Sequence, residues 1–345
     1  MGAGSAWFRC LTSAVRGGVS RSVNRRRFLA CTAGAGGLAA LAGAWPRRLR
    51  SIERRSWALG SEVALTVLHE DAALAERSLT AAFAVLDEIE ESLSLYRPQS
   101  ALCRLNRAGV LENPPADLVT VLRAALAWSA ATEGAFDPTV QPFWALHAGG
   151  NQPGPLELEA ACARVDWRRV EVASDRIRLG PGQGITLNGI AQGFAVDRVR
   201  EVLTGYGIRR ALIDTGEIGG LGRKAGDEPW RVGIQHPRRS DAYVALAEVA
   251  DRVLATSGDY RTAFDGGFSS HHIVDPATGR SPESLSSVSV VAPTGMEADA
   301  LSTAVFVLGP DRRLALAARC PGVEVLLVDK AGGVRSTPAF PEARV

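Results

Sequence analysis

The sequence predicts an α+β protein with one large domain of mixed sheets and packed helices. Strand-like and helix-like segments alternate without a regular period, and two strand-like runs at 244–249 and 253–256 are close enough to pair as a hairpin. No G-x-G-x-x-G motif follows a first strand, so a doubly wound dinucleotide-binding fold lacks its main sequence feature. The length of 345 residues, 46% of them hydrophobic, is sufficient for a large core.

Residues 1–44 have the features of an export signal. A twin-arginine pattern, N-R-R-R-F-L, occupies 24–29, and an Ala/Gly/Leu run follows it and ends at Ala44. That run is short and glycine-rich for a membrane span, which needs about 20 apolar residues. We expect export by the twin-arginine machinery to the periplasm with cleavage after Ala44; an uncleaved membrane anchor is the alternative. Residues 45–56 are expected to form a surface linker, and 57–340 the domain.

The charge distribution gives no support for a nucleic-acid partner. Residues 1–44 contain six arginines and no acidic residue, so the formal charge of +2 becomes −4 for the rest of the chain. Beyond the leader there are three cysteines, Cys103, Cys162 and Cys320, without metal-type spacing. One disulfide could form in an oxidising compartment, but the sequence does not select the pair.

The first part of the domain is predicted to contain a strand, two helices and two short strands. Residues 63–68 alternate between apolar and polar side chains, as a half-buried strand does. Apolar residues then recur at helical spacing over 72–95 and again over 117–131. Short strands are expected near Val170 and Ile177.

The stretch at 184–193 is the central feature of the sequence. A β-like run at 184–187 enters a turn at Asn188 and Gly189, which opens a helix with apolar residues at 3.6-residue spacing. Backbone N–H groups at a helix N-terminus can receive a phosphate, and Gly189 and Gly193 allow close approach of a ligand or another backbone. An ordinary strand-to-helix connection is the alternative interpretation.

The second part of the domain is rich in strands that end in polar turns. One buried strand runs directly into the polar turn D-T-G-E at 214–217, and ends of strands are common places for functional residues. A helix is expected to begin near Glu297 and to stop at Gly309-Pro310. The predicted strands lie at 211–214, 230–234, 244–249, 253–258, 271–275, 287–292 and 323–328.

Asp299, Ser302 and Thr303 place three oxygen-bearing side chains within one helical turn. Hard cations such as Mg²⁺ prefer oxygen ligands of this kind, with substrate phosphates completing the shell. A helix N-cap without a metal is the alternative, because the same residue types are preferred there. The pair His271-His272 lacks a third ligand at a supporting spacing, so a metal role is disfavoured for it.

Eight short motifs, in their order along the chain, resemble the ApbE family of FAD:protein FMN transferases from about residue 59 to 308. They are L-G-S (59–61), S-L-Y-x-x-x-S-x-L-x-x-L-N (94–106), A-F-D-P-T (135–139), L-N-G-I-A-Q-G-F-A-V-D (187–197), D-T-G-E (214–217), A-T-S-G-D-Y (255–260), H-H-I-V-D-P-x-T-G (271–279) and E-A-D-A-L-S-T-A (297–304).

The resemblance implies an ApbE-like, T-fold-related fold and a set of site residues. By matching position, the flavin contacts fall on Leu59, Tyr96, Ala135, Phe136, Asp137, Thr186, Gln192 and Ile273. The magnesium ligands fall on the Gly189 carbonyl, Asp299, Ser302 and Thr303. Asp299 and His272 are the candidate catalytic residues, His272 as general acid or base because imidazole titrates near neutral pH.

The activity that the resemblance implies is a Mg²⁺-dependent transfer of FMN from FAD. AMP is released, and the acceptor is a Thr or Ser hydroxyl of a flavoprotein, with a subunit of a respiratory membrane complex as one candidate. Two positions differ from the family pattern, since Thr186 replaces an aspartate and Gln192 a lysine, which indicates a divergent branch. The alternatives are an FAD pyrophosphatase and an FAD-binding protein without protein flavinylation.

Overall fold

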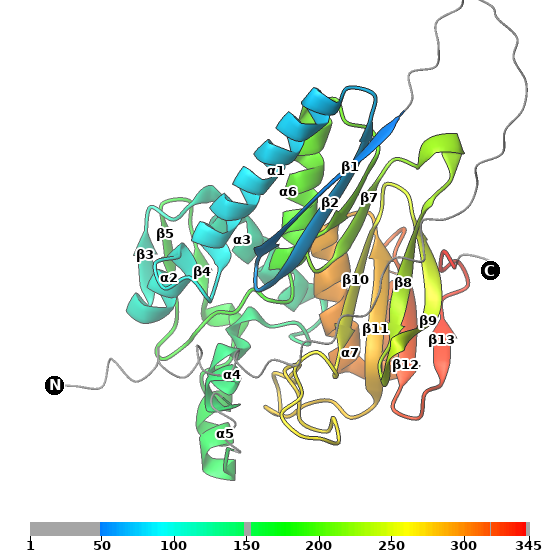
Figure 1. Ribbon diagram of the computed structural model, residues 1–345. Coiled ribbons are helices and arrows are strands. Elements are labelled where there is room, and N and C mark those ends of the chain that lie inside the picture. The colour runs from blue at the N-terminus through cyan, green and yellow to red at the C-terminus, as the bar shows by residue number, and fades with distance from the viewer. Residues whose placement is uncertain (1–48, 148–152, 318, 343–345) are drawn as a thin grey trace, which may run out of the picture.

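An eight-stranded antiparallel sheet forms the centre of the computed structural model, which describes residues 49–147, 153–317 and 319–342 (Figure 1). The strand order is β1-β2-β6-β7-β10-β11-β12-β13, so strands distant in sequence are neighbours. The bounds are β1 Arg50–Ala58, β2 Ser61–His69, β6 Ala211–Asp214, β7 Ile218–Leu221, β10 Val253–Gly258, β11 Leu285–Ala292, β12 Glu324–Asp329 and β13 Val334–Ser336.

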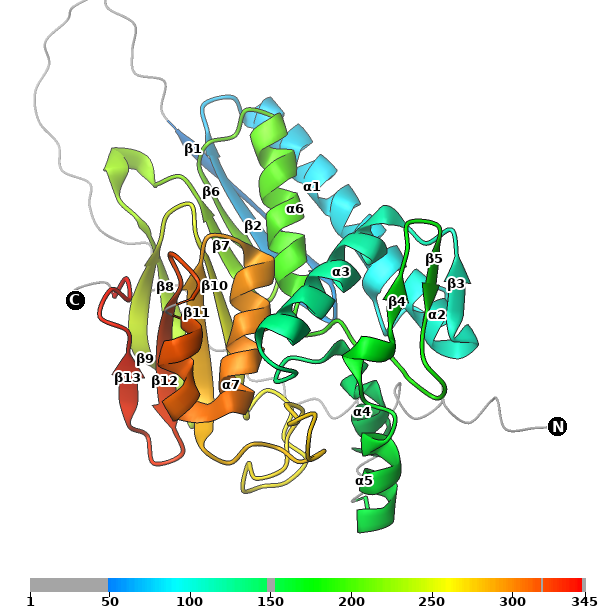
Figure 2. The same ribbon diagram turned by 180° about the vertical axis from the view of Figure 1, so that it is seen from behind.

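Three helices, α1 (Ala72–Leu93), α6 (Ala191–Gly205) and α7 (Gly295–Ala317), lie side by side over one face of this sheet (Figure 2). Asp71 starts α1 because its carboxylate accepts hydrogen bonds from the backbone N–H groups of Ala73 and Leu74. The buried side of α1 follows the predicted helical spacing, which packs its apolar residues onto the sheet.

A hairpin of β8 (Trp230–His236) and β9 (Arg239–Val249) covers the other face of the sheet at β10, β11 and β12. Alternate residues of β11 therefore enter different cores: Val290 packs on the helix side and Val291 on the hairpin side. Burial on both faces explains why the whole of β11 is buried and largely apolar.

A smaller group of elements, drawn in cyan and green, packs beside the helices (Figures 1 and 2). Most of its buried residues share one continuous hydrophobic core with the main sheet, which agrees with the single α+β domain that the sequence predicts. The buried residues Phe143 and Ala161 of its two helices at 141–147 and 155–162 form a small separate cluster with Val274. The elements are α2 Ala101–Ala108, β3 Val110–Glu112, α3 Ala116–Ala131, η2 Pro138–Val140, α4 Gln141–His147, α5 Pro155–Cys162, η4 Trp167–Arg169, β4 Glu171–Val172 and β5 Arg176–Arg178; a further 3-10 turn, η5 Ala225–Asp227, precedes β8.

The prediction of a linker at 45–56 is wrong for the residues that the structure describes. Residues 50–58 form β1, which pairs along its whole length with β2. Its charged side chains are compatible with an edge strand, where they lie in solvent and form ion pairs such as Arg54 with Glu76. Residues 1–48, including the predicted export signal, lie outside the described part of the chain.

Four other predictions need correction. The runs at 244–249 and 253–256 do not pair with each other, because β9 pairs with β8 and β10 pairs with β7 and β11. Residues 184–187 are not a strand, because the Asn106 side chain, rather than a neighbouring strand, pairs with the backbone of Ile185. Residues 271–275 form only an isolated bridge, between Ala263 and His271. The helix does break at Gly309, where φ is 75° and ψ −177°, but the chain returns to helical form after it. Among the described helices, none is both long and apolar enough to span a membrane.

Candidate active site

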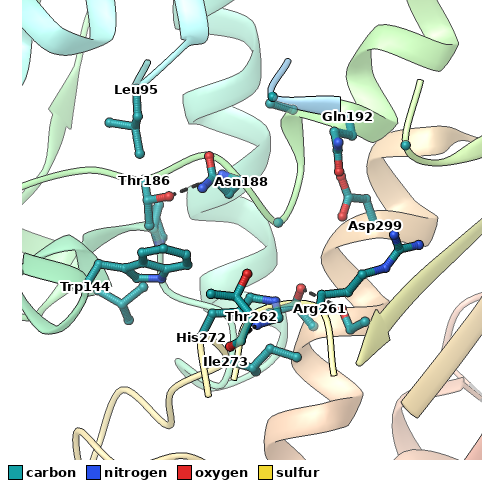
Figure 3. Close-up of a pocket in the computed structure, with 18 of the residues that line it drawn as sticks. Leu95, Trp144, Thr186, Asn188, Gln192, Arg261, Thr262, His272, Ile273 and Asp299 are labelled. Carbon is teal, nitrogen blue, oxygen red and sulfur yellow. Dashed lines mark hydrogen bonds between the residues drawn. The ribbon is translucent and has the colours of Figure 1, made fainter. Parts of the chain in front are cut away.

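A cavity of about 360 Å³ opens where loops from the sheet, the helices and the smaller group of elements meet (Figure 3). The segments that line it are separated by up to about 240 residues in the sequence. They are 59–61, 93–96, 135–144, 186–192, 216–217, 256–262, 272–276 and 299–303, each contributing some of its residues. All eight sequence motifs therefore supply residues to one cavity; the motif at 297–304 supplies Asp299 and Thr303.

The N-terminal ends of α6 and α7 cross in contact at two glycines, Gly193 and Gly295. A Cβ atom built at Gly193 would lie 2.1 Å from the Gly295 carbonyl oxygen, so no larger residue fits without moving a helix. The close crossing lets the Gly193 N–H donate a 2.9 Å hydrogen bond to Oδ2 of Asp299. The crossing thus fixes the carboxylate beside the glycine-rich turn.

The predicted magnesium ligands Gly189, Asp299 and Thr303 all line the cavity. A Cβ atom at Gly189 would lie 2.9 Å from Oγ1 of Thr303, which shows how closely the turn approaches α7. Ser302 differs, because it does not line the cavity and its hydroxyl contacts Oγ of Ser257 at 2.8 Å. Ser257, which the sequence analysis did not assign, is the hydroxyl residue that lines the cavity in its place.

Asp299 is not the N-cap of α7. The first N–H groups of the helix, at Gly295 and Met296, donate to the carboxylate of Asp197, and the Glu297 N–H donates to Oγ1 of Thr294. The capping function is therefore filled by other residues, and the carboxylate of Asp299 is left available to a ligand.

Two buried carboxyl groups, Asp299 and Glu217, face the same cavity. Burial raises the pKa of Asp299 to about 7, and the hydrogen bond from Gly193 opposes the rise. Burial also raises the pKa of Glu217 well above its ordinary value, with the negative charge of Asp299 adding to the effect. A cation between them would remove the cost of ionising both groups.

The predicted flavin contacts Leu59 and Tyr96 lie at the mouth of the cavity. Leu59 and Gly60 form the two-residue turn between β1 and β2, both with positive φ (53° and 75°) as a type I′ hairpin requires. The Leu59 N–H donates to Oε1 of Glu90, which holds the turn against α1. Tyr96 packs on Gly60, where a Cβ would lie 3.1 Å from the ring, and it remains 57% exposed.

The other predicted flavin contacts line the interior of the cavity. Phe136 lies against Gly189, and the carboxylate of Asp137 accepts hydrogen bonds from the backbone of Thr139 and Trp167. Gln192 donates a 3.3 Å hydrogen bond to Oγ of Ser61. Ala135, Thr186 and Ile273 complete the set of predicted contacts, all of which the fold brings together.

The two adjacent histidines have different environments. His271 is fully buried, packs edge-on against Phe306 and contacts the Pro282 carbonyl, so it is part of the core. His272 lines the cavity, and its Nδ1 lies 3.3 Å from the Thr262 carbonyl oxygen (Figure 3). Burial lowers the pKa of His272 to about 4. A neutral ring that donates from Nδ1 keeps Nε2 as a proton acceptor.

Comparison with known proteins identifies the family of the chain. The model of the ApbE family matches residues 59–327. The chain belongs to the ApbE family. An FAD:protein FMN transferase of Treponema pallidum is 33% identical over 325 residues, covering 86% of this chain and 87% of the relative. One of Salmonella typhimurium is 32% identical, covering 79% and 83%.

Solved ApbE structures have the same fold. The flavinyl transferase ApbE of Pseudomonas stutzeri, in its apo form, superposes with a TM-score of 0.76 at 29% identity, covering 88% of this chain and all of that one. The ApbE protein of Thermotoga maritima gives a TM-score of 0.78 at 28% identity, covering 85% and all of it. The fold predicted from the sequence is thereby confirmed.

Four residues of this ApbE site escaped the sequence analysis: Trp144, Glu217, Ser257 and Arg261 all line the cavity. Glu217 and Ser257 fall within quoted motifs, at strand ends, so their position was visible although their role was not. Trp144 contacts His272 edge to face, with ring centroids 6.0 Å apart, from a short helix that the sequence did not predict. Arg261 follows directly after the A-T-S-G-D-Y motif and carried no signal of its own.

Proposed function

We propose that this ApbE-family protein transfers FMN from FAD to an acceptor protein. The observation that carries the proposal is the gathering of eight separate motifs around one cavity, where hydroxyl, carboxylate and imidazole groups meet. The curated relatives that match over most of their length are FAD:protein FMN transferases, which supports the same activity here. FAD is therefore the substrate, and a flavoprotein is the partner.

We further propose that the reaction depends on Mg²⁺ held by Asp299, Thr303 and the backbone of Gly189. The donor set fits a hard cation, because it consists of a buried carboxylate with hydroxyl oxygens beside it. No cluster of three His, Cys, Asp or Glu side chains was found in the described residues, so substrate oxygens would complete the shell. When bound, Mg²⁺ withdraws negative charge from the pyrophosphate.

The proposed acceptor group is a Thr or Ser hydroxyl. Its oxygen attacks the phosphorus of the FMN half of FAD, a P–O ester bond forms, and the P–O bond to AMP breaks. The hydroxyl proton passes to Nε2 of His272, which is neutral at physiological pH because its pKa is about 4. AMP leaves as a phosphate monoester. His272 therefore acts in this proposal as a base, and not as an acid, in the first step.

The test is transfer itself. The purified protein is incubated with FAD, Mg²⁺ and candidate acceptor flavoproteins, AMP is quantified by chromatography, and the acceptor is weighed by intact mass spectrometry. We expect covalent FMN on the acceptor and one AMP for each adduct. The proposal fails if no acceptor gains mass under conditions where FAD is bound.

Hydrolysis of FAD to FMN and AMP is the second candidate, because the cavity is open to solvent beside Tyr96, whose side chain is 57% exposed. AMP released at the same rate with and without acceptor would favour it. Bound FAD that yields no AMP over hours would instead indicate a flavin-binding protein, the function that the uncharged Thr186 and Gln192 suggested.

We also propose that the protein works in the periplasm, exported by the twin-arginine machinery, and that its acceptor belongs to a respiratory membrane complex. The support is the twin-arginine pattern at 24–29. Fractionation of cells that express the full chain and a variant with both Arg25 and Arg26 replaced by lysine tests export. Equal periplasmic amounts of the two would contradict it.

A further inference from the structure

The cavity is lined by one arginine and no lysine among the described residues. That residue is Arg261, in the loop that follows β10, and its side chain extends from the loop toward Asp299 (Figure 3). Three carboxyl groups, of Asp137, Glu217 and Asp299, line the same cavity. A dinucleotide brings two more negative charges, so the ligand needs positive charge near its phosphates.

The start of the Arg261 loop is held firmly. Asp259, two residues earlier, is fully buried and accepts paired hydrogen bonds of 2.7 and 2.8 Å from Arg238, with Lys330 at 2.7 Å. Tyr260 packs on Gly258, where a Cβ would lie 2.4 Å from the ring. The backbone at Arg261 therefore follows directly after two anchored residues, which lowers the entropic cost of placing its exposed side chain on a ligand.

The charge of Arg261 is not neutralised by a close partner. None of the ion pairs in the described part of the chain includes Arg261. Burial raises the pKa of both Asp214 and Glu217, and the charge of Arg261 partly opposes each rise, which places Arg261 near the acidic end of the cavity. The guanidinium has five N–H donors in a planar fork, so it retains donors for a phosphate.

We infer that Arg261 binds the pyrophosphate of FAD, on the side of the cavity formed by the loop after β10. The inference rests on the proposed function for the identity of the ligand. The position that matches the family's lysine carries the uncharged Gln192, so Arg261 is the cavity's resident positive charge. Arg261 is thus assigned as a substrate-binding residue whose contact is specific to the phosphates and independent of the flavin ring.

Three ligands separate phosphate recognition from flavin recognition. FAD has both parts, ADP has the pyrophosphate without the flavin, and riboflavin has the flavin without phosphate. Their dissociation constants are measured by equilibrium titration, in EDTA and again in Mg²⁺, for the unchanged protein and for R261Q, R261K and R280Q. Arg280 is the matched control, since it is exposed, belongs to the same loop and does not line the cavity.

We expect R261Q to weaken FAD and ADP binding by about 10- to 100-fold, the range for a charge-assisted hydrogen bond. Riboflavin binding should change less than about twofold, R261K should lie between, and R280Q should match the unchanged protein. R261K provides the same comparison should R261Q fail to fold.

Equal FAD and ADP affinities in R261Q and the unchanged protein would overturn the inference. An equal loss of riboflavin affinity would also overturn it, because that loss would show a general disturbance of the cavity. The inference fails likewise if the unchanged protein binds neither FAD nor ADP. The proposed function can fail separately. If FAD binding depends on Arg261 but no FMN adduct forms, only the proposed transfer is contradicted. If FMN is transferred but R261Q binds FAD as tightly as the unchanged protein, only the inference on Arg261 is contradicted.

Discussion

Replacement of Asp299 by asparagine should separate the metal site from the fold. The amide oxygen can still accept the hydrogen bond from Gly193, so the local geometry is kept, but the negative charge is removed. If Asp299 is a metal ligand, D299N loses both Mg²⁺-dependent transfer and the stabilisation that bound Mg²⁺ provides. At a Mg²⁺ concentration of 100 times Kd, that stabilisation is about 2.7 kcal/mol, a rise in Tm of roughly 5 °C.

Without divalent cations the same variant should be more stable than the unchanged protein. Burial raises the folded-state pKa of Asp299 from 3.8 to about 7, so ionising it in the folded state costs up to about 4 kcal/mol. The unchanged protein therefore has its full free energy of unfolding below pH 3.8, where Asp299 is protonated in both states, and loses part of it as the pH rises to about 7. The advantage of D299N in EDTA should therefore be larger at pH 8 than at pH 5.5.

Urea unfolding at both pH values and thermal unfolding with and without Mg²⁺ measure these effects. D197N is the control, because Asp197 is a half-buried acid of α6 that caps α7 and does not line the cavity. It should lose about 1 kcal/mol of cap stability and keep its response to Mg²⁺. A D299N protein that Mg²⁺ still stabilises by several degrees would refute the assignment of Asp299 as a ligand.

Two further predictions concern the helix crossing and the base. G193A should lose about 1–3 kcal/mol of unfolding free energy, measured by urea unfolding, because its Cβ would overlap the Gly295 carbonyl. The control G205A, which has open space around it, should lose none. Equal stabilities of the two variants would show that the helix crossing relaxes freely. H272A should transfer FMN about 10²- to 10⁴-fold more slowly while binding FAD within about threefold of the unchanged protein. A loss confined to FAD affinity, with kcat unchanged, would rule out His272 as the base.

All predicted site residues except Ser302 line one cavity, because they occur in ordered motifs that the fold brings together. The sequence predicted the sheet strands less completely, because the patterns used assume one buried face. β1 carries arginines and glutamates on an edge, where charge is tolerated, and so resembled a linker. In β11 the serines alternate with valines in the sequence, which suggested one exposed face, but the strand is buried on both faces.

Two site residues show what such patterns cannot resolve. His271 and His272 are adjacent and chemically identical, yet the first packs on Phe306 and the second lines the cavity, because neighbouring side chains on an extended backbone point in opposite directions. Only the resemblance to a family motif favoured His272. Arg261 is distinguished from the other arginines of the chain by the turn that points it inward, and that turn depends on the distant residues Arg238 and Lys330.

The charges of the cavity lead to a conclusion about how the substrate is held. Asp137, Glu217 and Asp299 are buried together, Gln192 is uncharged, and His272 is neutral at physiological pH, so only Arg261 among the described lining residues opposes them. Burial raises the pKa of Asp299 to about 7 and that of Glu217 well above its ordinary value, so these carboxyl groups ionise fully only when positive charge lies beside them. A divalent cation, the proposed Mg²⁺, would supply that charge for the carboxyl groups and for the phosphates of an anionic dinucleotide. On the proposed function we therefore expect FAD to bind more tightly in Mg²⁺ than in EDTA, with Arg261 providing the part of the attraction that the protein carries itself.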